Sequence, residues 1–228
     1  MSIFNIGSFD KRDLLIMIAA RIFVLFCVLP IHEFAHALIA DKLGDKTARL
    51  SGRLTVSPLA HLDLVGSIMI VILGFGYAKP VPVNPNNFKK PKAGMALTAA
   101  AGPISNLIMA TVFLLIYNTF VFFGTNFFAG NPNLAYIISY FFIFASRINI
   151  SLAVFNLLPV PPLDGSRLFL ALLPDKYYFK VMQYERIIMI IIMILLLTGL
   201  LSGPINTLAD WVAKGLSYIT YLPFSLFS

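Results

Sequence analysis

The chain has 228 residues, of which 59% are hydrophobic and 12% are charged, and its net charge is +7 at neutral pH. A typical soluble domain has about 25% charged residues, so this composition and a mean hydropathy of +0.86 exclude an ordinary soluble domain and predict a membrane protein. The basic residues lie in loops beside apolar segments, as in loops that face anionic lipid, and this argues against nucleic acid as a partner.

The first apolar segment covers residues 14–40, which is longer than the ~20 residues that a membrane-spanning helix needs. It is too long for the apolar part of a signal peptide and has no clear cleavage site, so we expect it to be retained. Pro30 removes the backbone hydrogen bond to the carbonyl of Phe26, which predicts a loosened or kinked helix at that point. The single cysteine, Cys27, also lies here and cannot form an intrachain disulfide.

The second apolar segment covers residues 64–78, which is short for a complete crossing, and it is interrupted by Gly66, Gly74 and Gly76. Lysine and arginine residues flank it on both sides. If the segment crossed the membrane, one of these basic clusters would lie outside, against the positive-inside tendency. We therefore predict a re-entrant hairpin with both of its ends on the cytoplasmic side.

Three further apolar segments cover residues 95–123, 136–158 and 187–201, and a weaker one at 205–227 is predicted as either a span or an interfacial helix. The loop at 124–135 has no lysine or arginine and is predicted to be external, whereas the basic loop at 163–186 is predicted to be cytoplasmic. Together these segments predict an all-α polytopic membrane protein, a helical bundle of about four to six spans with a re-entrant or extended hairpin on the cytoplasmic side.

The most specific motif, HEFAH, occupies residues 32–36 near the end of the first segment. His32 and His36 lie four residues apart on one face of a helix, so both can bind one metal ion. Glu33 is placed to take a proton from a water at that metal. Ionisable groups inside an apolar segment cost at least a few kcal/mol each, which favours a metal site over ordinary polar contacts between helices.

A catalytic zinc site usually has three protein ligands, and the candidates for the third are His61, Asp63 and Asp164. Asp164 follows the 136–158 segment at the depth expected for His36, because both precede basic loops, so Asp164 is the predicted third ligand. His61 and Asp63 could form a gating pair, support the ligands, or cap a loop.

Several other polar or small residues lie inside the apolar segments. Gly102, Pro103 and Asn106 are predicted to permit close packing of helices. Arg147 and Asn149 are embedded polar residues to which the sequence assigns no role.

The paired motifs HEFAHA and NLLPVPPLDG, at residues 32–37 and 156–165, resemble those of the site-2 protease family of intramembrane metalloproteases. The stretches GRLTVSPLAHLDLVGS, GYAKPVPVNPNNF and AAGPISNL are also similar to the compact prokaryotic branch of that family. The resemblance covers about residues 20–170, and the chain has no room for the PDZ or CBS domain that many relatives carry.

The resemblance implies one zinc ion per chain, with His32, His36 and Asp164 as ligands and Glu33 as the catalytic glutamate. It also implies that Asn156 lies near the scissile peptide and hydrogen-bonds the oxyanion or the substrate backbone. An equal alternative for Asn156 is a cap or a hydrogen bond between helices.

We therefore predict an intramembrane zinc metalloprotease that hydrolyses peptide bonds in or near transmembrane segments of membrane proteins or membrane peptides. It would form one membrane-embedded domain over residues 1–228, with a catalytic core at about 14–170 and C-terminal helices at about 185–226. The predicted location is multi-pass in a cell membrane, the inner membrane of a prokaryote. The alternatives are a metal transporter or metal-binding membrane protein with the same ligands, and an inactive homologue that acts as a scaffold.

Overall fold

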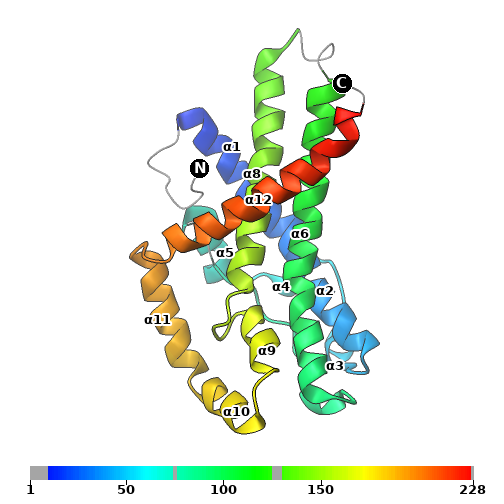
Figure 1. Cartoon of the computed structure of the whole chain (residues 1–228), viewed down its shortest axis with the longest axis vertical. Coiled ribbons are helices and arrows are strands. Elements are labelled where there is room, and N and C mark those ends of the chain that lie inside the picture. Colours follow the sequence, from blue (N-terminus) through cyan, green and yellow to red (C-terminus); the bar gives the residue numbers. More distant parts are fainter. Residues whose placement is uncertain (1–9, 74–75, 125–129, 227–228) are drawn as a thin grey trace.

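The computed structural model describes residues 10–73, 76–124 and 130–226, and most of this part is helical (Figure 1). Within it, three helical segments are long and apolar enough to cross a membrane: Lys11–Lys42, Pro91–Phe123 and Pro132–Asn156. These segments pack against one another in a single bundle. The predicted all-helical membrane bundle is therefore confirmed.

The first spanning segment is not one regular helix. It consists of α1 (Lys11–Phe23), a π-helical turn η2 (Val24–Val28) and α2 (Leu29–Lys42). Pro30, the second residue of α2, has no N–H group, so the turn before it cannot close the usual α-helical hydrogen bonds and widens instead. The loosened helix predicted at this proline is confirmed.

The core of the bundle lies where α1 and η2 pack against the other two spanning helices, α6 (Pro91–Phe123) and α8 (Pro132–Asn156). Its buried side chains come from all of these elements, among them Met17, Ala20, Val28, Phe113, Phe144 and Ile148. Because lipid is as apolar as these side chains, close packing rather than exclusion from water stabilises the bundle.

The predicted hairpin begins with a short helix. After the single-turn helices α3 (Thr47–Leu50) and α4 (Pro58–His61), the chain forms α5 (Leu64–Leu73), which has ten residues. Ten residues of α-helix rise about 15 Å, half of the ~30 Å hydrocarbon thickness of a bilayer. The side chain of Asp63 accepts a hydrogen bond from the amide of Gly66 and so caps the start of α5.

The chain then returns along α5. The amide of Lys79 donates to the carbonyl of His61 at 2.8 Å, and a Cβ atom on Gly76 would overlap the carbonyl oxygen of Gly66. The outgoing and returning limbs therefore touch beside the first turn of α5 and just before it, in agreement with a hairpin. Its turn, which includes Gly74, lies outside the described residues.

A buried carboxylate joins the loop after α2 to the loop before α6. The side chain of Asp45 is fully buried and accepts hydrogen bonds from the amide of Thr47, the amide of Asn84 and the side chain of Asn87. Burial alone would raise the pKa of Asp45, but these hydrogen bonds outweigh burial and lower it. The ionised carboxylate fixes η3 (Pro85–Asn87) and the start of α6 relative to α2.

Four helices follow α8: α9 (Asp164–Leu170), α10 (Asp175–Gln183), α11 (Glu185–Leu197) and α12 (Ser202–Ser225). The predicted segment at 187–201 is thus a helix of 13 residues. The weaker segment becomes α12, which packs across α6 and α8 (Figure 1). Neither helix is among the three described segments that meet the length and composition of a span.

Candidate metal centre

The three predicted metal ligands lie together where α2, α6 and α9 meet. The Nε2 atoms of His32 and His36 are 3.1 Å apart, and Asp164 Oδ2 lies 3.4 Å from each of them. Zinc bonds of about 2.0–2.1 Å at tetrahedral angles place neighbouring ligand atoms roughly 3.3 Å apart. The spacing of the three side chains therefore fits one tetrahedral zinc ion.

The two histidines are almost sealed from solvent, whereas the aspartate is not. The side chains of His32 and His36 are 6% and 10% exposed, but the side chain of Asp164 is 22% exposed. The cluster thus has a closed side within the helices and a more open side at α9. A catalytic zinc site needs such an open side, because one coordination position must stay available for water or substrate.

A backbone carbonyl of α6 sets the orientation of one imidazole. The Nδ1 atom of His36 lies 2.7 Å from the carbonyl oxygen of Thr98. A carbonyl can only accept a hydrogen bond, so Nδ1 carries the proton and the lone pair is on Nε2, which faces Asp164. The sequence gives no sign of this contact, since any residue at position 98 supplies a carbonyl.

Gly102 lets α6 approach the histidines closely. A Cβ atom at this position would overlap Nε2 of His36 and would lie 2.5 Å from Cε1 of His32. The packing role that the sequence predicts for Gly102 is therefore packing against the candidate ligands themselves. The run of small residues AAAG that ends at Gly102 was the signal in the sequence for close packing.

The proline-rich segment after α8 carries Asp164 to the cluster. Residues 157–163 are not helical, and the Pro161–Pro162 peptide bond is cis. A Cβ atom on Gly165 would overlap the carbonyl of Leu157, so this glycine allows the start of α9 to fold back against the end of α8. Asp164, the first residue of α9, then faces α2.

Glu33 and Asn156 are placed less completely than the three ligands. Glu33 is 8% exposed on α2 beside His32, and no hydrogen bond or ion pair of its carboxylate is found among the described residues. Asn156 is the last residue of α8 and is half-buried. No contact between its amide and the cluster is found in the same part of the chain, so its role stays a prediction.

His61 and Asp63 lie outside the cluster. The Nε2 atom of His61, which is fully buried, donates to the carbonyl of Thr55 at 2.8 Å. Asp63 caps α5. These contacts agree with the loop-capping alternative for both residues.

Comparison with known families decides the class of this protein. A family model described as Peptidase family M50 matches residues 20–200 of the chain. The chain belongs to peptidase family M50. The resemblance to site-2 proteases is therefore confirmed, and M50 membership makes the chain a membrane protease.

Three relatives show how far the similarity extends. The chain is 41% identical over 169 residues to "Putative zinc metalloprotease YwhC" of Bacillus subtilis, a match that covers 74% of this chain and 76% of the relative. It is 30% identical over 186 residues to a zinc metalloprotease of Methanocaldococcus jannaschii, covering 81% of this chain and 44% of that protein. It is 29% identical over 140 residues to "Putative zinc metalloprotease Rip2" of Mycolicibacterium smegmatis, covering 59% and 50%.

The chain thus spans about half the length of the last two relatives. No solved structure matches the M50 chain.

Proposed function

We propose that this M50 chain is an intramembrane zinc metalloprotease of the cell membrane, which hydrolyses peptide bonds in or near transmembrane segments of membrane proteins. The observation that carries the proposal is the convergence of His32, His36 and Asp164, with ligand atoms 3.1–3.4 Å apart, inside a bundle of spanning helices. Zinc is the metal, because relatives of the chain are named zinc metalloproteases.

A zinc ion held by His32, His36 and Asp164 would supply Lewis acidity, which would lower the pKa of a water molecule and polarise a carbonyl. Glu33 acts as the general base: its carboxylate takes the proton of the attacking water and passes it to the leaving amine. The contact between His36 and the carbonyl of Thr98 keeps Nε2 directed at the metal position. The amide of Asn156 donates to the oxygen on which negative charge develops.

The substrate has to unwind before it can be cut, because a transmembrane helix uses its own carbonyls in its hydrogen bonds. The returning limb of the hairpin, residues 76–84, forms neither helix nor turn, and Asn84 at its end has an extended backbone. We infer that this limb, near residues 78–83, pairs with the unwound substrate as an added strand.

Two substitutions test the proposal when zinc content and cleavage are measured on the same preparations. Purified wild type should contain one zinc ion per chain and should cleave a membrane-inserted reporter peptide. Glu33→Gln should keep the zinc and lose activity by about 100-fold or more, because the general base is gone. Asp164→Ala should lose both zinc and activity, because only two ligands remain.

Glu185→Gln is the matched control, since Glu185 lies on α11 and outside the cluster; it should leave zinc content and cleavage unchanged. Full cleavage by Glu33→Gln, or full zinc content in Asp164→Ala, would overturn the proposal. A metal transporter would instead retain zinc flux into vesicles in the Glu33→Gln variant, because transport does not need a general base.

A further inference from the structure

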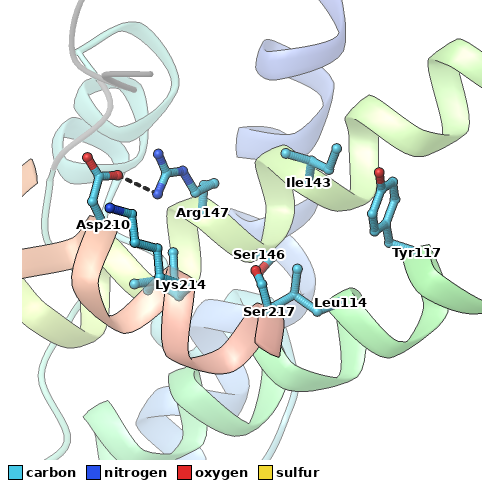
Figure 2. Close-up of a pocket in the computed structure, with 10 residues that line it drawn as sticks. Leu114, Tyr117, Ile143, Ser146, Arg147, Asp210, Lys214 and Ser217 are labelled. Carbon is cyan, nitrogen blue, oxygen red and sulfur yellow. Dashed lines mark ion pairs between the residues drawn. The ribbon is translucent and has the colours of Figure 1, made fainter. Parts of the chain in front are cut away.

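A second polar site lies between α6, α8 and α12. Side chains of these helices line an open cavity (Figure 2). Its volume of about 630 Å³ is within the range of about 300–1,000 Å³ that is typical of small-molecule sites. Leu114 of α6 and Ile143 and Ile150 of α8 line it with apolar surface. The cavity therefore offers an apolar chain a surface to lie on.

Charged groups from two helices face the same cavity. Arg147 of α8 forms an ion pair with Asp210 of α12, with an N–O distance of 2.6 Å (Figure 2). Lys214 lies one helical turn after Asp210 and also lines the cavity, and no ion pair of Lys214 is found among the described residues. Two positive groups and one negative group give the cavity one excess positive charge.

A buried hydroxyl adds a hydrogen-bond donor without a partner. Ser146 of α8 is 1% exposed and lines the cavity, and its Oγ atom has no hydrogen-bond partner in the described part of the chain. A buried hydroxyl without a partner carries an energetic cost, because it has lost its hydrogen bonds to water. A ligand that accepts a hydrogen bond would remove this cost, and Ser217 of α12 supplies a further hydroxyl to the same cavity (Figure 2).

This cavity is distinct from the candidate metal centre. Along α8, Arg147 precedes Asn156 by nine residues, or about 14 Å of helix, and along α6, Leu114 follows Gly102 by twelve residues, or about 18 Å. Ionisable groups in membrane-embedded helices are rare and usually face a partner or a cavity that has a function. A ligand here would not touch the reacting groups.

We propose that this cavity binds the anionic head of a membrane amphiphile, a fatty-acid carboxylate or a lipid phosphate, with its acyl chain along the apolar wall. Lys214 neutralises the anion, the guanidinium of Arg147 donates both to the anion and to Asp210, and the Ser146 hydroxyl donates a hydrogen bond to the anion. The apolar wall of the cavity thus matches the acyl chain of such a molecule, and the excess positive charge matches its anionic head.

The size of the cavity favours an amphiphile over a helix of a protein partner. An α-helix with its side chains is about 10 Å across, so 630 Å³ would hold less than two turns of it. A zwitterionic lipid brings its own cation and would leave the excess positive charge of the cavity uncompensated. The cavity is therefore expected to bind an anionic amphiphile with higher affinity than a zwitterionic lipid.

Native mass spectrometry of the full chain in neutral detergent tests the proposal with four probes: oleic acid, phosphatidylglycerol, phosphatidylcholine and inorganic phosphate. One molecule of oleic acid or of phosphatidylglycerol should bind, and the stronger of the two identifies the head group. Phosphatidylcholine should bind at least tenfold more weakly, and phosphate alone should not bind. Lys214→Gln should weaken binding of the preferred probe at least tenfold.

Lys180→Gln is the matched control, because Lys180 lies on α10 and does not line the cavity; it should bind like wild type. Ser146→Ala is a second, milder variant, for which we expect binding to weaken about threefold or more. Equal binding by wild type and both cavity variants, equal binding of zwitterionic lipid, or displacement of the amphiphile by a membrane-inserted acidic peptide would overturn the proposal. This readout does not depend on proteolysis, so its failure is distinguishable from a failure of the proposed protease activity.

Discussion

Gly102 illustrates how a missing side chain can shape a metal centre. In Gly102→Ala, the added methyl group would displace the imidazoles of His32 and His36, which it would otherwise overlap. We expect zinc affinity to fall by about 10- to 100-fold, the range that follows loss of the groups that support metal ligands. Competition with a chromogenic chelator measures this change directly.

Gly215→Ala is the matched control, because a Cβ atom at Gly215 of α12 meets nothing within 4 Å. The same alanine should leave zinc affinity unchanged there. Equal zinc affinity in Gly102→Ala and wild type would contradict the close approach of α6 to the histidines.

At this scale the sequence predicts side chains far better than backbone contacts. His32, His36 and Asp164 are recognisable because each carries a metal-binding atom and lies in a motif, and the structure brings all three together. The carbonyl of Thr98 is invisible in the sequence, because every residue has one. Glu33 and Asn156 stay predictions, since their roles appear only with a substrate.

A buried arginine holds the hairpin helix against the first spanning segment. Arg21 of α1 is 1% exposed, and its Nη1 atom donates to the carbonyls of Val71 and Ile72 at 2.8 and 3.0 Å. These carbonyls belong to the last turn of α5, where the helix cannot supply its own donors and carries partial negative charge. Arg21 is therefore a cap from another helix.

Arg21→Met keeps the length of the side chain and removes the cap. A hydrogen bond from a charged group contributes about 1.5–3 kcal/mol, so we expect the amides of α5 to exchange with deuterium at least tenfold faster. Hydrogen exchange with mass spectrometry, read on peptides from residues 64–73, measures the effect.

Arg12→Met is the control, because Arg12 bonds to the carbonyl of Asn133 and stacks on Tyr136, away from α5. It should not change exchange in α5. Unchanged exchange in Arg21→Met would mean that packing alone holds this helix.

The hairpin itself was predictable, but its anchor was not. Basic residues on both sides of residues 64–78 and the shortness of the segment indicate a hairpin. Arg21 appears in the sequence only as a single charge within an apolar segment. Its partners are backbone carbonyls fifty residues away, and no local pattern identifies them.

For the whole molecule, α12 ties the C-terminal part of the chain to two spanning helices. An apolar cluster that includes Ala110, Ile150 and Ile205 joins it to α6 and α8. The ion pair between Arg147 and Asp210 adds a polar link within the same interface. From the sequence, the segment that forms α12 could be either a span or an interfacial helix. The pairing of Arg147 with Asp210, 63 positions apart, cannot be predicted from the periodicity of apolar residues.

A double-mutant cycle measures this link. Arg147→Gln and Asp210→Asn should each lower the free energy of unfolding in detergent, and the double variant should lose less than the sum. Because the two side chains are 24% and 44% exposed, we expect a coupling energy of only about 1 kcal/mol.

Arg147→Gln combined with Glu185→Gln should be additive and serves as the control, since no ion pair joins these residues among those described. Additive effects in the Arg147–Asp210 cycle would show that the ion pair does not stabilise the interface.

The π-helical turn Val24–Val28 also sets how α1 and α2 are rotated relative to each other about the helix axis. Each residue advances an α-helix by about 100°. Upstream of the turn, Arg21 faces α5, and downstream, His32 and His36 face α6 and α9. Removing one residue from the turn would rotate one half of the segment against the other, so the hairpin anchor and the histidines could not both keep their partners. Related chains should therefore vary in residue type within these five positions while their number stays constant.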